Sequence, residues 1–455
     1  MRAIVIGAGQ VGSSIIGALA AEGADVVAID WSENKLRELR DTYDIQTLSG
    51  SGSNPSILSE AGVVAADMLV AVTNSDEVNM VACAIAQLRA PNSIRVARIR
   101  ESELIEGENV LGQLGFGVDH AINPEVVAVR RLTDILKVPI ASDVADCGKF
   151  LKLVGIRLPP GCPIDGKTVA ELRTLAPDLK VLLATRVREG ESRIPDGNDD
   201  VRAGDTLFTV IHPNDLPALA ELLQLNWRPT KRVTIAGGGP IGAMLAASLE
   251  KEPGFSIKLI EPDVERAHVL AERLEKTLVL QGSPTDESLL LEENIRDCDA
   301  FIAALPEPET NVMAALNAKR LGAYRVIALI EKLAYVPIIE NAGVDAVVSP
   351  RALAIGTILH HIRKGRVKNV IPYGVTGQTE ALEFEALETA DAVDKPLKSV
   401  KFPDGVVVGA ISRGEETIIP DGNDVILPGD NVFVFASKKA IPKLEKMMAV
   451  KFEFF

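Results

Sequence analysis

The sequence contains the same glycine turn twice, 230 residues apart. Gly7-Ala8-Gly9-Gln10-Val11-Gly12 follows the apolar run 3–6, and Gly237-Gly238-Gly239-Pro240-Ile241-Gly242 follows a similar run at 233–236. A buried strand, a glycine turn and a helix start in this order form the G-x-G-x-x-G pattern of dinucleotide-binding folds. The repetition predicts that one such unit is duplicated within the chain.

The three glycines of the first turn have different expected roles. Gly7 permits the tight turn, Gly9 lets a pyrophosphate approach the backbone, and Gly12 lets the helix pack closely on the strand. A second apolar run, 24–29, ends in Asp30, where a carboxylate is expected to bind ribose hydroxyls. The phosphates are expected on the free amides of the helix start. These residues predict a nucleotide site.

Strand and helix patterns alternate through residues 1–123. Apolar strands are expected at 67–72 and 94–98, separated by a helix that Asp76 is expected to cap. The alternation predicts a doubly wound parallel α/β sheet, whose ligand lies beyond the carboxyl ends of its strands. Besides the glycine turn, those ends are expected to bring together Asp30, Gly50 to Ser53, Thr73, Asn74 and Arg98.

A second repeated motif follows each predicted sheet. Ile194-Pro195-Asp196-Gly197-Asn198-Asp199 recurs as 419–424, and a Gly-Asp pair follows each copy. Pro-Asp-Gly-Asn suits a hairpin or bulge, because glycine accepts positive φ. Each copy falls in a small predicted α+β module. The predicted organisation is therefore two Rossmann-like domains at 1–123 and 231–349, alternating with α+β domains at 142–226 and 370–455.

Composition narrows the function. The chain has 455 residues, a formal net charge of −15 and four cysteines, none of them in a C-x-x-C spacing. An acidic chain is poorly suited to nucleic acid, since phosphate binding needs a basic face. The cysteine content argues against a disulfide framework or a zinc site and favours a reducing cytoplasm. No apolar run reaches about 18 residues, so any membrane role is expected to be peripheral.

This four-part order resembles the TrkA family, the cytosolic RCK-domain regulators of bacterial Trk potassium uptake systems. The resemblance covers essentially the whole chain, and residues 66–74 with Asp76 and Asn79 are typical of the first half of such proteins. It implies a homo-oligomeric ring, usually a tetramer, peripheral on the cytosolic face of the inner membrane. The ring's partner would be the membrane potassium-translocating Trk subunit. NAD or NADH would bind the first half, and ATP or ADP the same or the second site. The bound nucleotide would gate ion flow without catalysis.

The resemblance also implies roles for individual residues. Gly7 to Val11 would hold the pyrophosphate, and Asp30 the adenosine ribose; Thr73, Asn74 and Arg98 would complete the site. A carboxylate at Asp30 favours free ribose hydroxyls and repels a 2′-phosphate, so NADP is expected to bind poorly. Arg98 has two interpretations, as a phosphate ligand or as the partner of a nearby carboxylate.

The second half keeps only part of this pattern. The glycine turn is present, and Glu261 takes the place of the ribose-binding acid at a strand end. Leu305-Pro306 and Leu329 stand where the first half has its Thr-Asn pair and its arginine. A second nucleotide site at Gly237 to Ile241 and Glu261 therefore stays open, with a ligand that can differ from the first.

An NAD-dependent dehydrogenase is the alternative function, because the fingerprint does not distinguish hydride transfer from sensing. Such an enzyme needs an acid or base beside the nicotinamide. The chain has five histidines, and only His120 falls near the expected site. Catalysis does not require duplication of the whole unit, whereas a ring of alternating domains does. The duplication therefore favours the regulator.

Overall fold

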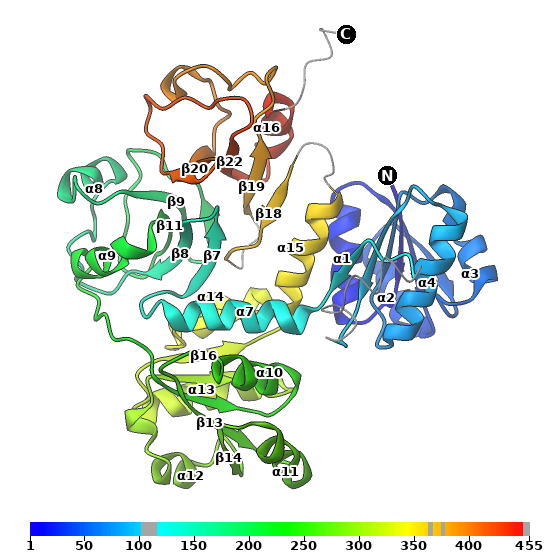
Figure 1. Cartoon of the computed structure of the whole chain (residues 1–455), viewed down its shortest axis with the longest axis horizontal. Coiled ribbons are helices and arrows are strands. Elements are labelled where there is room, and N and C mark those ends of the chain that lie inside the picture. The colour runs from blue at the N-terminus through cyan, green and yellow to red at the C-terminus, as the bar shows by residue number, and fades with distance from the viewer. Residues whose placement is uncertain (102–115, 363–366, 375–377, 449–455) are drawn as a thin grey trace. The chain divides into compact units, whose positions relative to one another are not determined.

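The computed structural model describes residues 1–101, 116–362, 367–374 and 378–448, and these residues form four sheets (Figure 1). In chain order, a six-stranded parallel sheet is followed by a five-stranded antiparallel sheet, and the pair then recurs. This alternation confirms the predicted fold class, two Rossmann-like sheets with two small α+β modules.

The first parallel sheet has the strand order β3-β2-β1-β4-β5-β6. Its strands are β1 (Arg2–Ile6), β2 (Asp25–Asp30), β3 (Gln46–Ser49), β4 (Met68–Ala71), β5 (Ile94–Arg98) and β6 (His120–Ile122). Its helices are α1 (Gln10–Ala21), α2 (Glu33–Thr42), α3 (Pro55–Glu60), η1 (Val63–Ala65), α4 (Asp76–Arg89) and α15 (Pro350–Ile362). The order reverses between β1 and β4, where an open α/β sheet forms its ligand crevice.

Long-range packing completes this sheet. The central strands β1 and β4 are buried and pair in parallel, with Ile6 opposite Ala71. One hydrophobic cluster joins α1 to Ala354 and Ile358 of α15. Residues 1–127 and α15 therefore form one compact unit, and a second unit begins at residue 128. A helix that follows the second sheet in the sequence thus belongs to the first.

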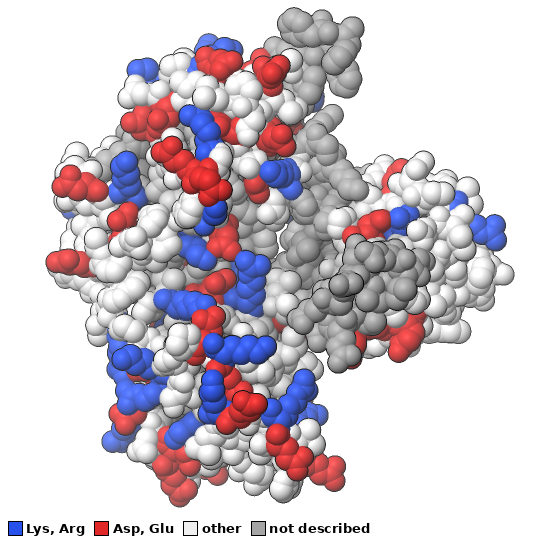
Figure 2. All heavy atoms as spheres, viewed as in Figure 1, with Lys and Arg blue, Asp and Glu red and all other residues white. Residues whose placement is uncertain are grey.

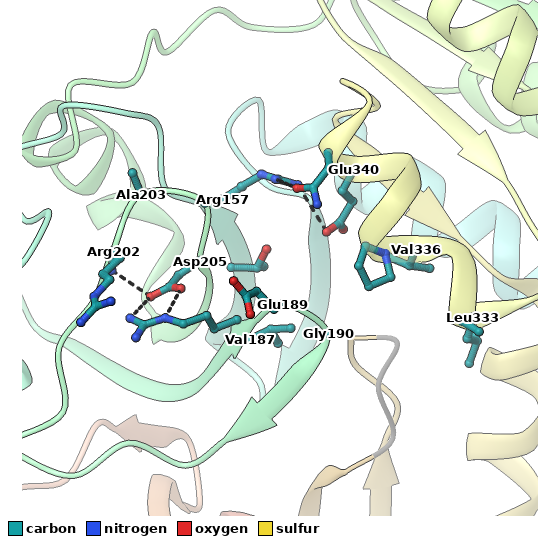
Figure 3. A pocket seen from close by; sticks show the side chains of 16 residues that line it. Arg157, Val187, Glu189, Gly190, Arg202, Ala203, Asp205, Leu333, Val336 and Glu340 are labelled. Atoms are coloured by element: carbon teal, nitrogen blue, oxygen red, sulfur yellow. Dashed lines mark hydrogen bonds and ion pairs between the residues drawn. The ribbon is translucent and has the colours of Figure 1, made fainter.

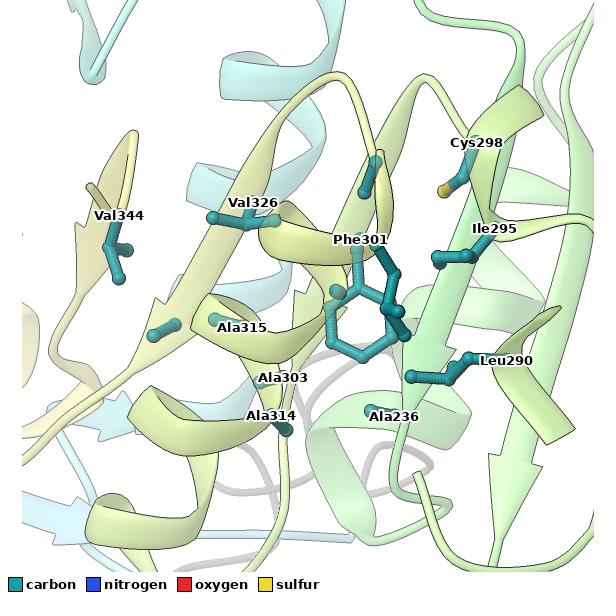
Figure 4. Close-up of a cluster of buried hydrophobic side chains, with 14 of the residues drawn as sticks. Ala236, Leu290, Ile295, Cys298, Phe301, Ala303, Ala314, Ala315, Val326 and Val344 are labelled. Atoms are coloured by element: carbon teal, nitrogen blue, oxygen red, sulfur yellow. The ribbon is translucent and has the colours of Figure 1, made fainter. Parts of the chain in front are cut away.

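The second parallel sheet has the equivalent order β14-β13-β12-β15-β16-β17. Its strands are β12 (Arg232–Ala236), β13 (Ser256–Glu261), β14 (Leu278–Gln281), β15 (Ala300–Ala303), β16 (Val326–Leu329) and β17 (Ala346–Val348). Its helices are α10 (Pro240–Leu249), α11 (Val264–Arg273), α12 (Glu287–Glu292), η3 (Ile295–Asp297), α13 (Pro308–Leu321), η4 (Leu333–Tyr335) and α14 (Val336–Asn341). In its core, Phe301 lies among small side chains that include Ala236, Ala303, Ala314 and Ala315 (Figure 4). Alanines at these positions leave room for the aromatic ring.

A buried arginine ties the helix α7 (Pro124–Lys137) to the second sheet. Arg325, just before β16, donates hydrogen bonds to the carbonyl oxygens of Ile135, Val138 and Ala141. Ile135 lies in the last turn of α7, and Val138 and Ala141 follow it, so the guanidinium holds the C-terminal end of this helix. Burial lowers the pKa of Arg325 to about 10, so the guanidinium remains charged at neutral pH.

The two antiparallel sheets have matching strand orders, β10-β9-β11-β8-β7 and β21-β20-β22-β19-β18. The first module contains β7 (Asp143–Cys147), β8 (Leu151–Arg157), α8 (Val169–Leu175), β9 (Val181–Arg188), β10 (Glu191–Arg193), β11 (Thr206–Ile211), η2 (Pro213–Asp215) and α9 (Leu216–Leu222). The second contains β18 (Asn369–Ile371), β19 (Thr379–Glu385), η5 (Leu397–Ser399), β20 (Val406–Arg413), β21 (Glu416–Ile418), β22 (Asn431–Ser437) and α16 (Ile441–Met448).

The repeated Pro-Asp-Gly-Asn motif forms the same loop in both modules. The N–H of Asp196 donates to the carboxylate of Asp199 at 2.8 Å, and the N–H of Asp421 donates to that of Asp424 at 2.6 Å. Each aspartate thus closes a turn through its own side chain. The motif therefore has a structural role in shaping the module.

The repeated Gly-Asp pair also has a structural role. Asp205 accepts two hydrogen bonds from the guanidinium of Arg188, at 2.7 and 2.8 Å, and Asp430 accepts two from Arg413 at the same two distances. Both aspartates are 1% exposed. A buried carboxylate needs such a partner, because removing it from water is otherwise costly.

The two modules share one hydrophobic core. Tyr373, between β18 and β19, lies edge-on to Phe208 of β11 and to Phe435 of β22, with ring centroids 5.0 and 5.7 Å away. Its hydroxyl group hydrogen-bonds with Thr185 at 2.8 Å and donates to Thr379 at 2.9 Å. The modules therefore pack against each other within one chain.

One expected helix cap was wrong. Ser75, not Asp76, is the N-cap of α4, and its hydroxyl accepts from the N–H of Val78 at 3.2 Å. Asp76 is the first helical residue and accepts hydrogen bonds from the N–H groups of Arg100 and Glu101. Serine and aspartate are both good N-caps, so the sequence alone did not show which of the two residues caps α4.

Candidate nucleotide-binding site

The first glycine turn has the backbone shape that its spacing predicts. Gly7 has a φ of 103°, a left-handed value that favours glycine. A Cβ at Gly12 would stand 1.7 Å from the carbonyl oxygen of Gly7, so only glycine lets α1 pack this closely on the turn. Within the described part of the chain, no atom lies within 4 Å of a Cβ placed on Gly9. The backbone at Gly9 therefore has open space beside it that a ligand can approach.

The start of α1 leaves its amides without a side-chain cap. Gly9 is the N-cap and makes no side-chain cap hydrogen bond, and the first turn contains no acidic residue. Gln10 and Val11 thus present N–H groups at the positive end of the helix dipole. Such an end binds phosphate groups. The residues present therefore fit a pyrophosphate.

Asp30 lies beside this turn. Its Oδ2 accepts a hydrogen bond from the N–H of Ala8 at 2.6 Å, and its Oδ1 accepts one from the N–H of Ser32 at 2.7 Å. These bonds fix the carboxylate where β2 ends. Each carboxylate oxygen has a further lone pair with which it can accept from ribose hydroxyls.

Asn79 joins two of the predicted site residues, Thr73 and Arg98. Its Oδ1 accepts from the N–H and the hydroxyl group of Thr73, at 3.0 and 2.8 Å, and its Nδ2 donates to the carbonyl oxygen of Arg98 at 2.8 Å. Asn79 is completely buried. It therefore clamps the carboxyl ends of β4 and β5. Sequence reasoning named Asn79 only as typical of the family's first half, although an asparagine on an apolar helix face was a signal for such a role.

The Arg98 side chain has a carboxylate partner. Its guanidinium pairs with Glu125, and the two side chains are only 14% and 17% exposed. The Nε of Arg98 and the Oε2 of Glu125 are buried and have no hydrogen-bond partner among the residues that the structure describes, so each can still bind a polar group. Asn74 accepts a hydrogen bond from Arg100 at 3.1 Å. Sequence reasoning missed Glu125, which lies 27 residues after Arg98.

The second glycine turn repeats the backbone of the first. Gly237 has a φ of 105°, and a Cβ at Gly242 would stand 1.9 Å from the carbonyl oxygen of Gly237. Glu261 accepts hydrogen bonds from the N–H groups of Gly238 and Asp263, at 2.6 and 2.9 Å. The longer glutamate thus binds the same pair of amides that the aspartate of the first half binds.

Three features make the second turn less suited to a dinucleotide. Pro240 is the first residue of α10 and has no N–H, so this helix start offers one amide fewer. Glu261 is 4% exposed, whereas Asp30 is only partly buried. Leu305 keeps the backbone clamp to Asn311, at 2.7 Å, but has no hydroxyl group.

Comparisons with known proteins assign the chain to a family. The TrkA-N domain model matches residues 3–124 and 233–350, and the TrkA-C domain model matches residues 153–224 and 381–449. The Trk system potassium uptake protein TrkA of Halomonas elongata is 35% identical over 459 aligned residues, which cover 100% of both chains. The chain belongs to the TrkA family. A relative of the same name from Vibrio alginolyticus is 37% identical to this TrkA-family chain and covers 98% of each.

Solved structures agree with the fold of this TrkA-family chain. The GsuK RCK domain matches 98% of this chain and 94% of its own length, with a TM-score of 0.61 and 18% identity. The GsuK channel bound to NAD also has a TM-score of 0.61 and 18% identity, over 98% of this chain and 78% of its own. At this identity the likeness shows the fold alone.

The TrkA-family chain also has a pocket of about 800 Å³, between the first antiparallel module and the segment from η4 to α14 (Figure 3). Arg157 reaches across it to Asn341, at 2.6 Å, and pairs with Glu340 at 3.5 Å. Arg188 in its wall is held by Asp205. Burial raises the pKa of Glu340, against the opposing effect of Arg157. Because these charges already compensate one another, the pocket does not point to a charged ligand.

One face of the TrkA-family chain carries charges of both signs. On the face seen in Figure 2, Lys and Arg side chains alternate with Asp and Glu. Within the ranges that the structure describes, no helix is both long enough and apolar enough to cross a bilayer.

Proposed function

We propose that this TrkA-family chain is the nucleotide-sensing regulatory subunit of a Trk-type potassium uptake system. Four copies form a ring on the cytosolic face of the inner membrane, and the ring binds the membrane potassium-translocating subunit. The full-length match to Trk system potassium uptake proteins supports this assignment.

The observation that carries the proposal is the first glycine turn with Asp30 beside it. An uncapped helix start, an open approach at Gly9 and a fixed carboxylate lie at the switch point of a parallel sheet. The donors and the acceptor suit a pyrophosphate and a ribose with free hydroxyls. NAD, NADH, ATP and ADP all contain this adenosine diphosphate portion, whereas NADP carries an additional 2′-phosphate that Asp30 repels.

Gating follows from differential binding. The ring has two shapes, and each nucleotide shifts their balance by the difference in its affinity for them. The ligands share one adenosine diphosphate portion but have different tails, and the tails produce the difference. Thr73, Asn74 and Arg98 lie at the neighbouring strand ends, where they contact these tails. The chain itself catalyses no reaction.

The second glycine turn has a lesser role. Gly237 to Ile241 and Glu261 keep the second sheet in the same shape, while Pro240 and Leu305 weaken its fit to a dinucleotide. Any ligand in the second half is bound more weakly than in the first, or is of another kind.

The proposal is tested with the purified full-length protein. Calorimetry with NAD, NADH, ATP and ADP should show binding, and NADP should bind more weakly. Sedimentation should give a tetramer. Potassium flux through the Trk membrane subunit in liposomes should change when this protein and a binding nucleotide are added together. Oxidation or reduction of added metabolites that depends on NAD would contradict the proposal and favour a dehydrogenase.

A further inference from the structure

We propose that Trp31 is the surface on which the adenine ring stacks when a nucleotide occupies the first half. This inference rests on the proposed function, because it assigns a residue and a base preference to that same site. It adds adenine recognition to the contacts with phosphate and ribose already described.

Trp31 is an exposed aromatic residue next to the carboxylate that is proposed to bind the ribose. It directly follows Asp30 at the end of β2, and it is 77% exposed. A tryptophan gains much from covering its large aromatic face, and an exposed indole forgoes that gain. In adenosine the base is attached directly to the ribose. A ligand whose ribose is bound by Asp30 therefore carries its base close to the next residue of the chain.

The loop that follows the neighbouring strand β3 has small side chains. Asp30 pairs with Ser49 of β3, and the N–H of Gly50 donates to the carbonyl oxygen of Asp30 at 3.0 Å. The loop that follows is Gly50-Ser51-Gly52-Ser53. A loop of glycine and serine puts no bulky side chain beside the end of β2. The hydroxyl groups of Ser51 and Ser53 bond each other at 2.8 Å and can also bond the polar edge of a base.

The second half of the molecule serves as an internal comparison. Pro262 follows Glu261 and occupies the position equivalent to Trp31. The loop beside it contains Pro284 and Thr285 in place of glycine and serine. Proline has no aromatic face for a base, so the adenine preference belongs to the first half alone.

The effect of the stack is large enough to measure. Alanine substitution of an aromatic residue under a base weakens binding by roughly 5- to 150-fold. Trp31→Ala should therefore raise the Kd for ADP by such a factor. Trp31→Phe should retain most of the affinity, because phenylalanine still offers an aromatic face. Both variants should keep the wild-type Tm, since the side chain is mostly exposed.

The test uses the full chain, with ADP and nicotinamide mononucleotide as probes. The chain has two tryptophans, Trp31 and Trp227. ADP should quench the emission of Trp31, the quench should persist in the control Trp227→Phe, and it should be lost in Trp31→Phe. Nicotinamide mononucleotide contains no adenine, so Trp31→Ala should leave its affinity unchanged.

Each outcome separates this inference from the proposed function. Wild-type ADP affinity in Trp31→Ala would overturn the adenine stack and leave the nucleotide sensor in place. Equal losses for ADP and nicotinamide mononucleotide would also overturn it, because the site as a whole would then be damaged. A changed sedimentation coefficient with unchanged affinity would assign Trp31 to a subunit contact instead. Wild-type protein that binds no nucleotide would overturn the proposed function itself.

Discussion

The two parallel sheets have the same backbone and different side chains around the expected ligand. In both, the first glycine of the turn has a positive φ, an acidic residue binds two amides, and a buried asparagine clamps two strand ends. The residues that differ include Gln10, Trp31, Thr73 and Arg98 in the first half and Pro240, Pro262, Leu305 and Leu329 at the equivalent positions of the second.

This difference shows that the glycine motif can shape the backbone in both halves without the same ligand contacts around it. The glycines and the acidic residue that shape the turn recur in both halves, whereas Thr73, Asn74 and Arg98, which are expected to complete the site, have no counterpart in the second. G-x-G-x-x-G is therefore evidence first for a backbone shape and only second for a ligand. Matched substitutions in the two halves can test that separation.

The largest effect is expected from the glycines that pack helix on turn. Gly12→Ala and Gly242→Ala would each place a Cβ within 2 Å of a backbone carbonyl oxygen, at 1.7 and 1.9 Å. Each should lower the free energy of unfolding by about 3 kcal/mol or more, because backbone must move. Urea unfolding measures the loss. Gly9→Ala is the control and should cost less than about 1 kcal/mol; tolerance of Gly242→Ala would show that the second turn is held less tightly.

The asparagine clamps should matter equally in the two halves. Asn79→Ala and Asn311→Ala each remove several buried hydrogen bonds and leave their backbone partners unsatisfied. A loss of about 2–4 kcal/mol in unfolding free energy is expected for each. Thermal and urea unfolding test this, with the exposed Asn214→Ala as control. A clear loss in one half only would mean that the shared frame is not equally important in both.

Nucleotide affinity should fall when the acidic residue of the first half is replaced, but not when that of the second half is replaced. Asp30→Ala should raise the Kd for ADP at least tenfold, about 1.4 kcal/mol, because the ribose loses its acceptor. Glu261→Ala should change it less than about twofold. Calorimetry on both variants decides the point. Loss of binding in Glu261→Ala alone would move the main site to the second sheet.

A smaller difference in stability is expected for the aspartates that directly precede β15 and β4. Asp299 is 5% exposed and accepts hydrogen bonds from the N–H groups of Arg232 and Lys231 and from the guanidinium of Arg228. Burial opposes its ionised form, but these hydrogen bonds hold the pKa of Asp299 below its ordinary value. Its equivalent, Asp67, is exposed and accepts one hydrogen bond from the N–H of residue 2.

The depressed pKa of Asp299 gives a definite pH dependence. Its stabilising contribution is present above the ordinary aspartate pKa of about 3.9 and is lost as pH falls below that value through the folded pKa. Asp299→Asn should cost about 1–2 kcal/mol at pH 7, and the gap from wild type should narrow below about pH 4. Asp67→Asn should cost less. Urea unfolding of both variants from pH 7 to pH 3 tests these expectations. A difference in unfolding free energy between Asp299→Asn and wild type that stays constant with pH would exclude this explanation.

The sequence predicted those features that depend on neighbouring residues. The glycine turn, the strand that leads into it and the strand that ends in Asp30 all follow from local pattern and from the conformational freedom of glycine. Internal repetition then predicted the second sheet and the second module without any new argument. It also indicated correctly that the two halves differ at Leu305 and Leu329.

Contacts between distant residues could not be predicted in this way. Nothing near Arg98 in the sequence indicates that Glu125 is its partner, and nothing near Asp205 points to Arg188. The cap of α4 shows a smaller limit, because Ser75 and Asp76 have similar local preferences. Three-dimensional placement decided each of these cases.

The membership of α15 in the first unit affects how the chain can be made. Ala354 and Ile358 pack in the core of the first sheet, yet the ribosome adds them more than 220 residues after residue 127. At roughly 5–20 residues per second, this delay lasts on the order of 10–50 s. During that interval the nascent first domain lacks one of its helices and exposes the apolar face that α15 later covers. Early termination within the second half would therefore release an unfinished first half as well.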